Sequence, residues 1–151
     1  KFEMKLILVV ASAFVAVSAR DWSVGARGQL MCGDKPLSGA TVKLWDLDTW
    51  PDPDDLLMET TTDSNGRFEI KGTENEFTKI TAVLKFYHRC NNRGMFNIPN
   101  FCKRKITYEI PSSYINGGQS VTKWYELGTM NMEAKQRGED TECLPNILGR
   151  R

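Results

Sequence analysis

The sequence predicts an all-β fold, arranged as a two-sheet sandwich of about seven to eight strands. Apolar and polar residues alternate along many short runs, as in strands that bury one face. Glycine, proline, asparagine and aspartate cluster between these runs, where turns are expected. Hardly any segment repeats its apolar residues at helical spacing, and 151 residues with 40% hydrophobic residues suit one cored domain.

The first two strands are expected at residues 24–32 and 41–48. In the first, every second residue from Val24 to Cys32 is small or apolar, so these residues share one face. Residues 33–36, Gly-Asp-Lys-Pro, form a turn. In the second strand Val42 and Leu44 point to the core.

An acidic exposed loop at residues 50–55 follows, since its two prolines cannot donate to a ladder. Residues 56–62 and 67–71 form the strands of a hairpin around the Asp-Ser-Asn-Gly turn at 63–66. Residues 73–78 are compatible with one helical turn or with a loop, and the sequence does not decide between them.

Residues 79–90 form a long strand with apolar residues on both faces, which places it in the centre of a sheet. Residues 105–110 alternate again and end at Pro111. After a turn at 116–118, residues 121–127 and 128–133 supply the last strands.

The two ends of the chain lie outside this domain. Met4-Lys5 followed by an uncharged apolar run to Val17 and by Ser18-Ala19 is typical of a signal peptide, residues 1–19, cleaved after Ala19. Residues 1–3 then precede the initiator as a non-native leader. We therefore expect a secreted protein without a transmembrane segment, with its domain at residues 20–133 and a polar tail at 134–151.

Export places the four cysteines in an oxidising compartment, so two disulfides are expected. The local pairing Cys90–Cys102 is favoured, which leaves Cys32–Cys143 to tether the tail to the first strand. The other two connectivities remain open. The spacing of the cysteines is not that of a zinc site.

Several segments in order resemble the transthyretin-like family that is expanded in nematodes. They include residues 28–32 (Gly-Gln-Leu-Met-Cys), 36–44, 62–68 and 87–90 (Tyr-His-Arg-Cys). The resemblance spans residues 24–133 and implies a secreted, prealbumin-like two-sheet sandwich, which agrees with the strand pattern. A fold does not by itself supply a function.

The chemistry of the chain argues against catalysis. Hydroxyisourate hydrolases of the transthyretin fold use several histidines, an arginine and a Tyr-Arg-Gly-Ser terminus, whereas this chain has His88 alone and ends in Leu148-Gly149-Arg150-Arg151. We expect no enzyme activity and no cofactor. His88 is interpreted as a packed, hydrogen-bonded ring, and the acidic loop as solvated, so no metal is expected.

The charge balance argues against nucleic-acid binding, because removal of residues 1–19 leaves 18 basic and 18 acidic residues. We expect a binding protein whose main surface is the basic, aromatic loop between Cys90 and Cys102, with a small hydrophobic ligand, a lipid or a cell-surface partner as its target. Association through sheet edges, with another copy or another protein, is the alternative. The candidate binding residues are Arg93, Met95, Phe96, Phe101, Lys103 and Arg104.

Overall fold

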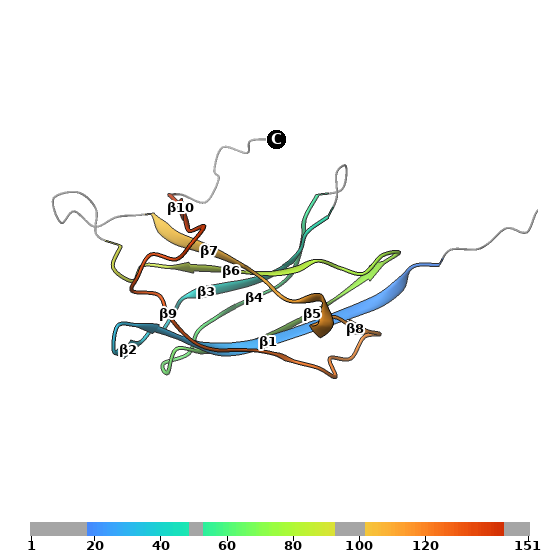
Figure 1. Cartoon of the computed structure of the whole chain (residues 1–151), viewed down its shortest axis with the longest axis horizontal. Coiled ribbons are helices and arrows are strands. Elements are labelled where there is room, and N and C mark those ends of the chain that lie inside the picture. The colour runs from blue at the N-terminus through green and yellow to red at the C-terminus, as the bar shows by residue number, and fades with distance from the viewer. Residues whose placement is uncertain (1–17, 49–52, 93–101, 144–151) are drawn as a thin grey trace, which may run out of the picture.

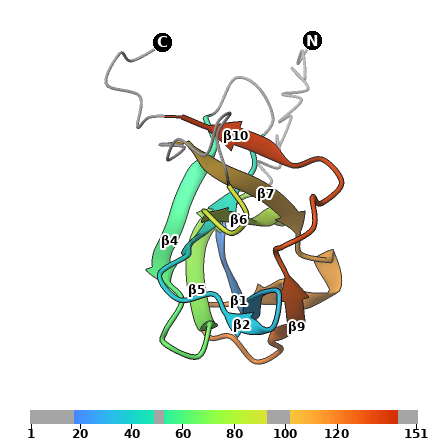
Figure 2. The same cartoon turned by 90° about the vertical axis from the view of Figure 1, so that its left-hand side faces the viewer.

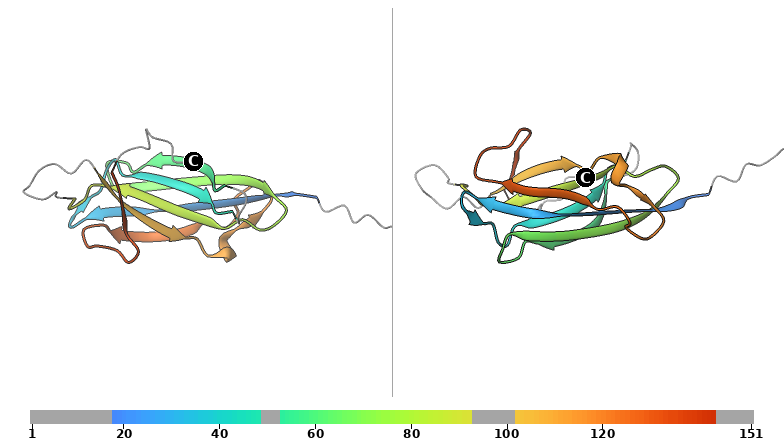
Figure 3. Two further views of the ribbon diagram at one scale, coloured as in Figure 1. Left: turned by 90° about the horizontal axis from the view of Figure 1, so that it is seen from above. Right: turned by 60° about the horizontal axis from the view of Figure 1, so that its bottom comes forward.

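The computed structural model describes residues 18–48, 53–92 and 102–143. These residues form two five-stranded sheets packed face to face (Figures 1 and 2). The predicted all-β sandwich is therefore confirmed. Most strands of both sheets run roughly along the long axis of the molecule (Figure 3).

The first layer, here the β1 sheet, is organised around one long strand, β1 (Arg20–Cys32). Strand β5 (Arg67–Glu76) pairs with it antiparallel, and β9 (Tyr125–Asn131) pairs with it parallel. The two-residue strands β2 (Lys35–Pro36) and β8 (Asn116–Gly117) add to its ends. Within the described residues β5 has no second partner, so it is an edge strand.

The second layer, the β6 sheet, has the order β10-β7-β6-β3-β4. Its strands are β3 (Thr41–Asp46), β4 (Asp55–Thr61), β6 (Ala82–His88), β7 (Lys103–Glu109) and β10 (Asp140–Glu142). The predicted central strand is confirmed, because β6 lies in the middle of the sheet and buries Val83 and Tyr87 on its outer face as well as Leu84 and Phe86 on its inner face.

The core lies between the two sheets and follows the predicted alternation. Val24, Ala26 and Leu30 of β1 face Val42 and Leu44 of β3, and all five are fully buried or nearly so. Burial of each large side chain stabilises the fold by roughly 1.5–3 kcal/mol. In each of these strands, the alternation of side chains alone therefore determines which residues face the core.

The turn at residues 63–66 forms as predicted, but the hairpin prediction is wrong. The Asp63 carboxylate accepts the backbone N–H groups of Asn65 and Arg67, each at 2.8 Å. Strand β4 pairs with β3 and strand β5 with β1, so the turn carries the chain from one sheet to the other. β4 and β5 border the same side of the sandwich (Figure 2). They belong to different sheets and pack against each other there without sharing a ladder.

Of the segment 73–78, expected as a helical turn or a loop, residues 73–76 extend β5, and Phe77 and Thr78 form a bend after it. The ladder continues because β1 begins at Arg20, earlier than predicted, and supplies partners for Thr73 to Glu76. The two predicted strands at 121–133 are one, β9, with a register shift beside Gly128. Strand β10 was not predicted, and it makes the segment after residue 133 part of the sandwich up to Cys143.

Both predicted disulfide pairings are wrong, although all four cysteines are bonded. Cys32 bonds to Cys90, with their Cα atoms 5.6 Å apart, because β1 and β6 end at the same end of facing sheets. Cys102 bonds to Cys143, since both continue the register that places Lys103 opposite Glu142. Cys143 therefore tethers the tail to β7 instead of β1.

Candidate functional site

The predicted binding surface is only partly visible. Arg93, Met95, Phe96 and Phe101 lie outside the described residues, and Lys103 is half-buried at the start of β7. Arg104 is buried, so its place on a binding surface is corrected: it points inward on the same face of β7 as Ile106.

The Arg104 guanidinium holds the chain after β9. It donates to the carbonyl oxygens of Cys90 at 2.7 Å, Met132 at 2.8 Å and Ala134 at 2.9 Å. It also forms a bidentate pair with the buried Glu139 carboxylate, at 2.6 and 2.7 Å, and this pairing lowers the pKa of Glu139. Arg104 is thus a structural residue.

His88 is packed beside this network, as predicted. Its ring is 3% exposed, and Nδ1 accepts the N–H of Cys90 at 3.2 Å. The proton of the neutral ring is therefore on Nε2. Burial, helped by the nearby positive charge of Arg104, lowers the pKa of His88 to about 4. The ring stays neutral, and within the described residues its Nε2 has no hydrogen-bond partner.

Asp46 is a second buried ionisable group, only 1% exposed, and its carboxylate accepts the N–H of Thr81 at 2.8 Å. Burial, with smaller repulsion from Asp48 and Glu76, raises its pKa to about 6. Below pH 6 the folded state therefore binds a proton that the unfolded chain still lacks, and stability rises as the pH falls. His88 acts in the opposite direction, because the unfolded chain protonates near pH 6.5 and the folded state does not.

Between pH 7 and pH 5 we expect these effects to oppose each other, so that the free energy of unfolding changes little. Asp46→Asn removes the stabilisation that Asp46 provides at low pH, so the free energy of unfolding of that variant should fall by about 2 kcal/mol from pH 7 to pH 5. His88→Asn removes the destabilisation that His88 causes, so the free energy of unfolding of that variant should rise by about 1 kcal/mol over the same change. Urea denaturation at both pH values measures this, and two variants that both keep the wild-type profile would contradict the assignment.

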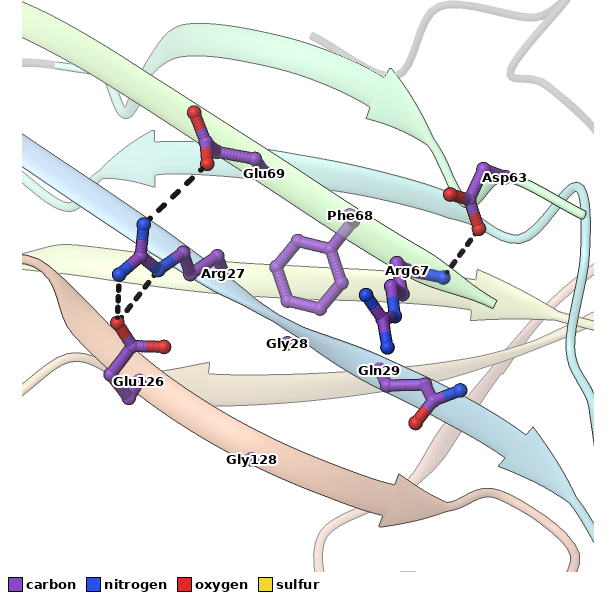
Figure 4. A pocket seen from close by; sticks show the side chains of 9 residues that line it. All are labelled: Arg27, Gly28, Gln29, Asp63, Arg67, Phe68, Glu69, Glu126 and Gly128. Atoms are coloured by element: carbon purple, nitrogen blue, oxygen red, sulfur yellow. Dashed lines mark hydrogen bonds and ion pairs between the residues drawn. The ribbon is translucent and has the colours of Figure 1, made fainter. Parts of the chain in front are cut away.

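A charged hollow of about 510 Å³ lies on the outer face of the β1 sheet (Figure 4). Arg27 lies between Glu69, at 3.8 Å, and Glu126, at 2.6 Å, and the Arg67 guanidinium extends toward Gln29. No histidine, serine or cysteine is among the described residues that line the hollow. Its charges are largely matched by one another.

A second cavity of about 430 Å³ wraps around the free edge of β5, and we call it the edge groove. Its walls come from β4, β5 and the segment between β8 and β9. The residues that line it are Leu57, Met58, Lys71, Gly72, Thr73, Gln119, Ser120, Val121 and Trp124. It combines large apolar side chains with one charged group, which is typical of a ligand site.

Two glycines give the groove its shape. A Cβ at Gly25 would lie 2.8 Å from the Trp124 ring, so the indole rests on bare backbone of β1. A Cβ at Gly72 would lie 2.6 Å from the Cβ of Leu57, so the absence of a side chain lets β4 approach β5 closely at this position. The floor of the groove and the close approach of its two strands thus depend on Gly25 and Gly72, which have no side chains.

Asn116 holds the wall that carries Trp124. Its buried amide donates to the carbonyl oxygens of Ser23 and Lys123, each at 3.2 Å, and its Oδ1 accepts the N–H of Lys123 at 2.9 Å. The segment is therefore fixed to β1 before any ligand arrives. The Arg27 guanidinium, 5.6 Å from the Trp124 ring centroid, covers the indole from the side of the charged hollow.

Across the ranges that the structure covers, no three or more histidine, cysteine, aspartate or glutamate side chains gather as metal ligands would. In the same ranges no helix has the length and apolar character needed to cross a bilayer.

Comparisons with known proteins agree with this fold. A model of the Transthyretin-like family matches residues 27–111. Transthyretin-like protein 33 of Caenorhabditis elegans is 43% identical over 122 residues, which cover 81% of this chain and 82% of that protein. Transthyretin-like protein 5 of the same organism is 42% identical over 144 residues, which cover 93% of this chain and 99% of that protein. The chain therefore belongs to the transthyretin-like family.

Proposed function

We propose that this chain is a secreted binding protein that holds a small apolar ligand in the edge groove. The observation that carries the proposal is the groove itself, a cavity of about 430 Å³ whose apolar walls are Leu57, Met58, Val121 and Trp124. Small-molecule sites have volumes of roughly 300–1,000 Å³ and combine apolar side chains with polar groups that orient the ligand.

The energetics favour occupation by an apolar group. Met58 is 47% exposed, an unusual position for a large apolar side chain that a ligand would cover. Each CH₂ group that a ligand buries there contributes roughly 0.8 kcal/mol. Because Asn116 already orders the Trp124 wall, binding costs little conformational entropy on that side.

The lining supports binding over catalysis. Among the described residues it holds no imidazole, thiol or carboxylate, and Lys71 is its one titratable side chain. Two disulfides and the apolar run expected as a signal peptide at residues 1–19 support secretion.

Titration of the oxidised protein with the neutral fluorophore Nile red tests the proposal. Met58→Asp replaces an apolar wall of the groove with a hydrated carboxylate and should weaken binding about tenfold or more, because an apolar ligand would have to displace that water. Leu56→Asp is the matched control, since Leu56 lies on the same strand with 45% exposure but outside the groove. It should change binding less than about twofold.

Equal loss of Nile red binding in the two variants, or no change in either, would contradict the assignment of the groove. Absence of Nile red binding to the wild-type protein would contradict the function itself.

Association through a sheet edge is a second candidate function, and one observation favours it. Strand β4 is the edge of the β6 sheet, carries the exposed residues Leu56 and Met58, and has no lysine or proline between Asp55 and Thr61 to block pairing. Light scattering over a concentration series would detect a dimer, and that dimer should dissociate in Leu56→Asp. A monomer at all concentrations excludes self-pairing.

A further inference from the structure

The edge groove contains one charged side chain, Lys71 of β5. Lys71 is exposed, and its antiparallel neighbour on β1 is Gly25, which has no side chain to cover it. Within the described residues the Lys71 ammonium makes no ion pair or hydrogen bond. The groove therefore offers an unmatched positive charge beside apolar walls.

Two carboxylates of the same sheet are already engaged by other groups. Glu69, two residues along the same face, pairs with Arg27 at 3.8 Å. Asp21 accepts the side-chain amides of Asn75 at 2.7 Å and Gln119 at 2.9 Å. Two other lysines of the sheets are paired, Lys43 with Glu59 at 3.0 Å and Lys85 with Asp54 at 3.7 Å. Among the described lysines without a carboxylate partner, Lys71 is the one that lines the edge groove.

We propose that the ligand of the edge groove is a single-chain anionic amphiphile, such as a free fatty acid, with its carboxylate at Lys71. Its hydrocarbon chain would lie against Met58, Val121 and Trp124. One unpaired ammonium matches one negative charge, and apolar walls on both sides match one chain. The inference rests on the proposed function, because it names the ligand class of the same groove.

Decanoate and decanol test the head group separately, because the two share a hydrocarbon tail and differ in charge. Isothermal titration at low salt should show that the wild-type protein prefers decanoate by roughly fivefold, the strength of a partly exposed ion pair. The preference should shrink at high salt because mobile ions screen it.

Lys71→Met keeps the apolar stem and removes the charge. It should abolish the preference for decanoate, because the affinity for decanoate then falls to that for decanol. Lys79→Met is the matched control, since Lys79 is an exposed lysine outside the groove, and it should keep the wild-type preference.

Each outcome decides one of the two claims. Equal binding of decanoate and decanol, or a preference that survives Lys71→Met, overturns the fatty-acid inference while Nile red binding still upholds the groove. Binding to anionic phospholipid vesicles without binding to decanoate also overturns the inference, because the ligand would then be a membrane surface. Loss of Nile red binding in the wild-type protein rejects both claims.

Discussion

Replacement of Arg104 by methionine is expected to lower the free energy of unfolding by about 3–5 kcal/mol. The substitution leaves the buried Glu139 carboxylate without its partner and removes donors from the carbonyl oxygens of Cys90, Met132 and Ala134. A buried charge without a partner has lost its hydration, and no other interaction compensates for that loss. Urea denaturation of the oxidised protein measures the loss.

Lys103→Met is the matched control for this prediction. Lys103 is the preceding residue of β7, but it points to the outer face and is half-buried. Its replacement should change stability by less than about 0.5 kcal/mol. Similar losses in the two variants would mean that Arg104 does not anchor the chain after β9.

Removal of the disulfide between the sheets, by Cys32→Ala with Cys90→Ala, should lower stability by about 2–5 kcal/mol. The bond joins residues 58 apart in sequence, so its removal lets the unfolded chain adopt more conformations. Cys90 is 4% exposed, so the double variant also loses a packed contact in the core. Denaturant midpoints with and without the bond measure the difference.

The second disulfide provides the comparison. Cys102–Cys143 holds β10, whose three residues are all exposed, so this strand can detach while the rest of the sandwich stays folded. Its removal should cost less than about 2 kcal/mol. Peptide mapping of the native protein should recover Cys32 linked to Cys90, and a fragment linking Cys90 to Cys102 would contradict the structure.

The alternation of apolar residues was enough to predict the buried faces of β1, β3 and β6, because a side-chain period of two identifies a face without knowledge of the partner strand. It could not predict which strands pair. The turn at Asp63 looks the same whether its strands share a ladder or face each other across the core, and the hairpin prediction failed for that reason.

The predicted disulfide pairing was wrong for a related reason. Local spacing favoured Cys90–Cys102, but only the pairing of β10 with β7 brings Cys143 beside Cys102, and three exposed polar residues carry no strand signal. The burial of Arg104 was predictable, since in an alternating strand Arg104 lies on the same face as Ile106, Tyr108 and Ile110. That face points into the sandwich.

The edge groove had no local signal. Met58 and Trp124 lie far apart in the chain and meet only because β4 approaches β5 at Gly72 and the Trp124 segment packs over Gly25. Trp124 was assigned to a strand, where an indole is ordinary. Tertiary packing, which sequence periodicity does not contain, creates this site.

An NMR titration of the ¹⁵N-labelled protein with decanol locates the ligand site. We expect chemical-shift changes confined to the groove, at the amides of residues 57–58, 71–73 and 119–124 and at the indole N–H of Trp124. Saturating decanol that shifts none of these signals, or that shifts those around Arg27 and Glu126 in the charged hollow instead, would contradict it.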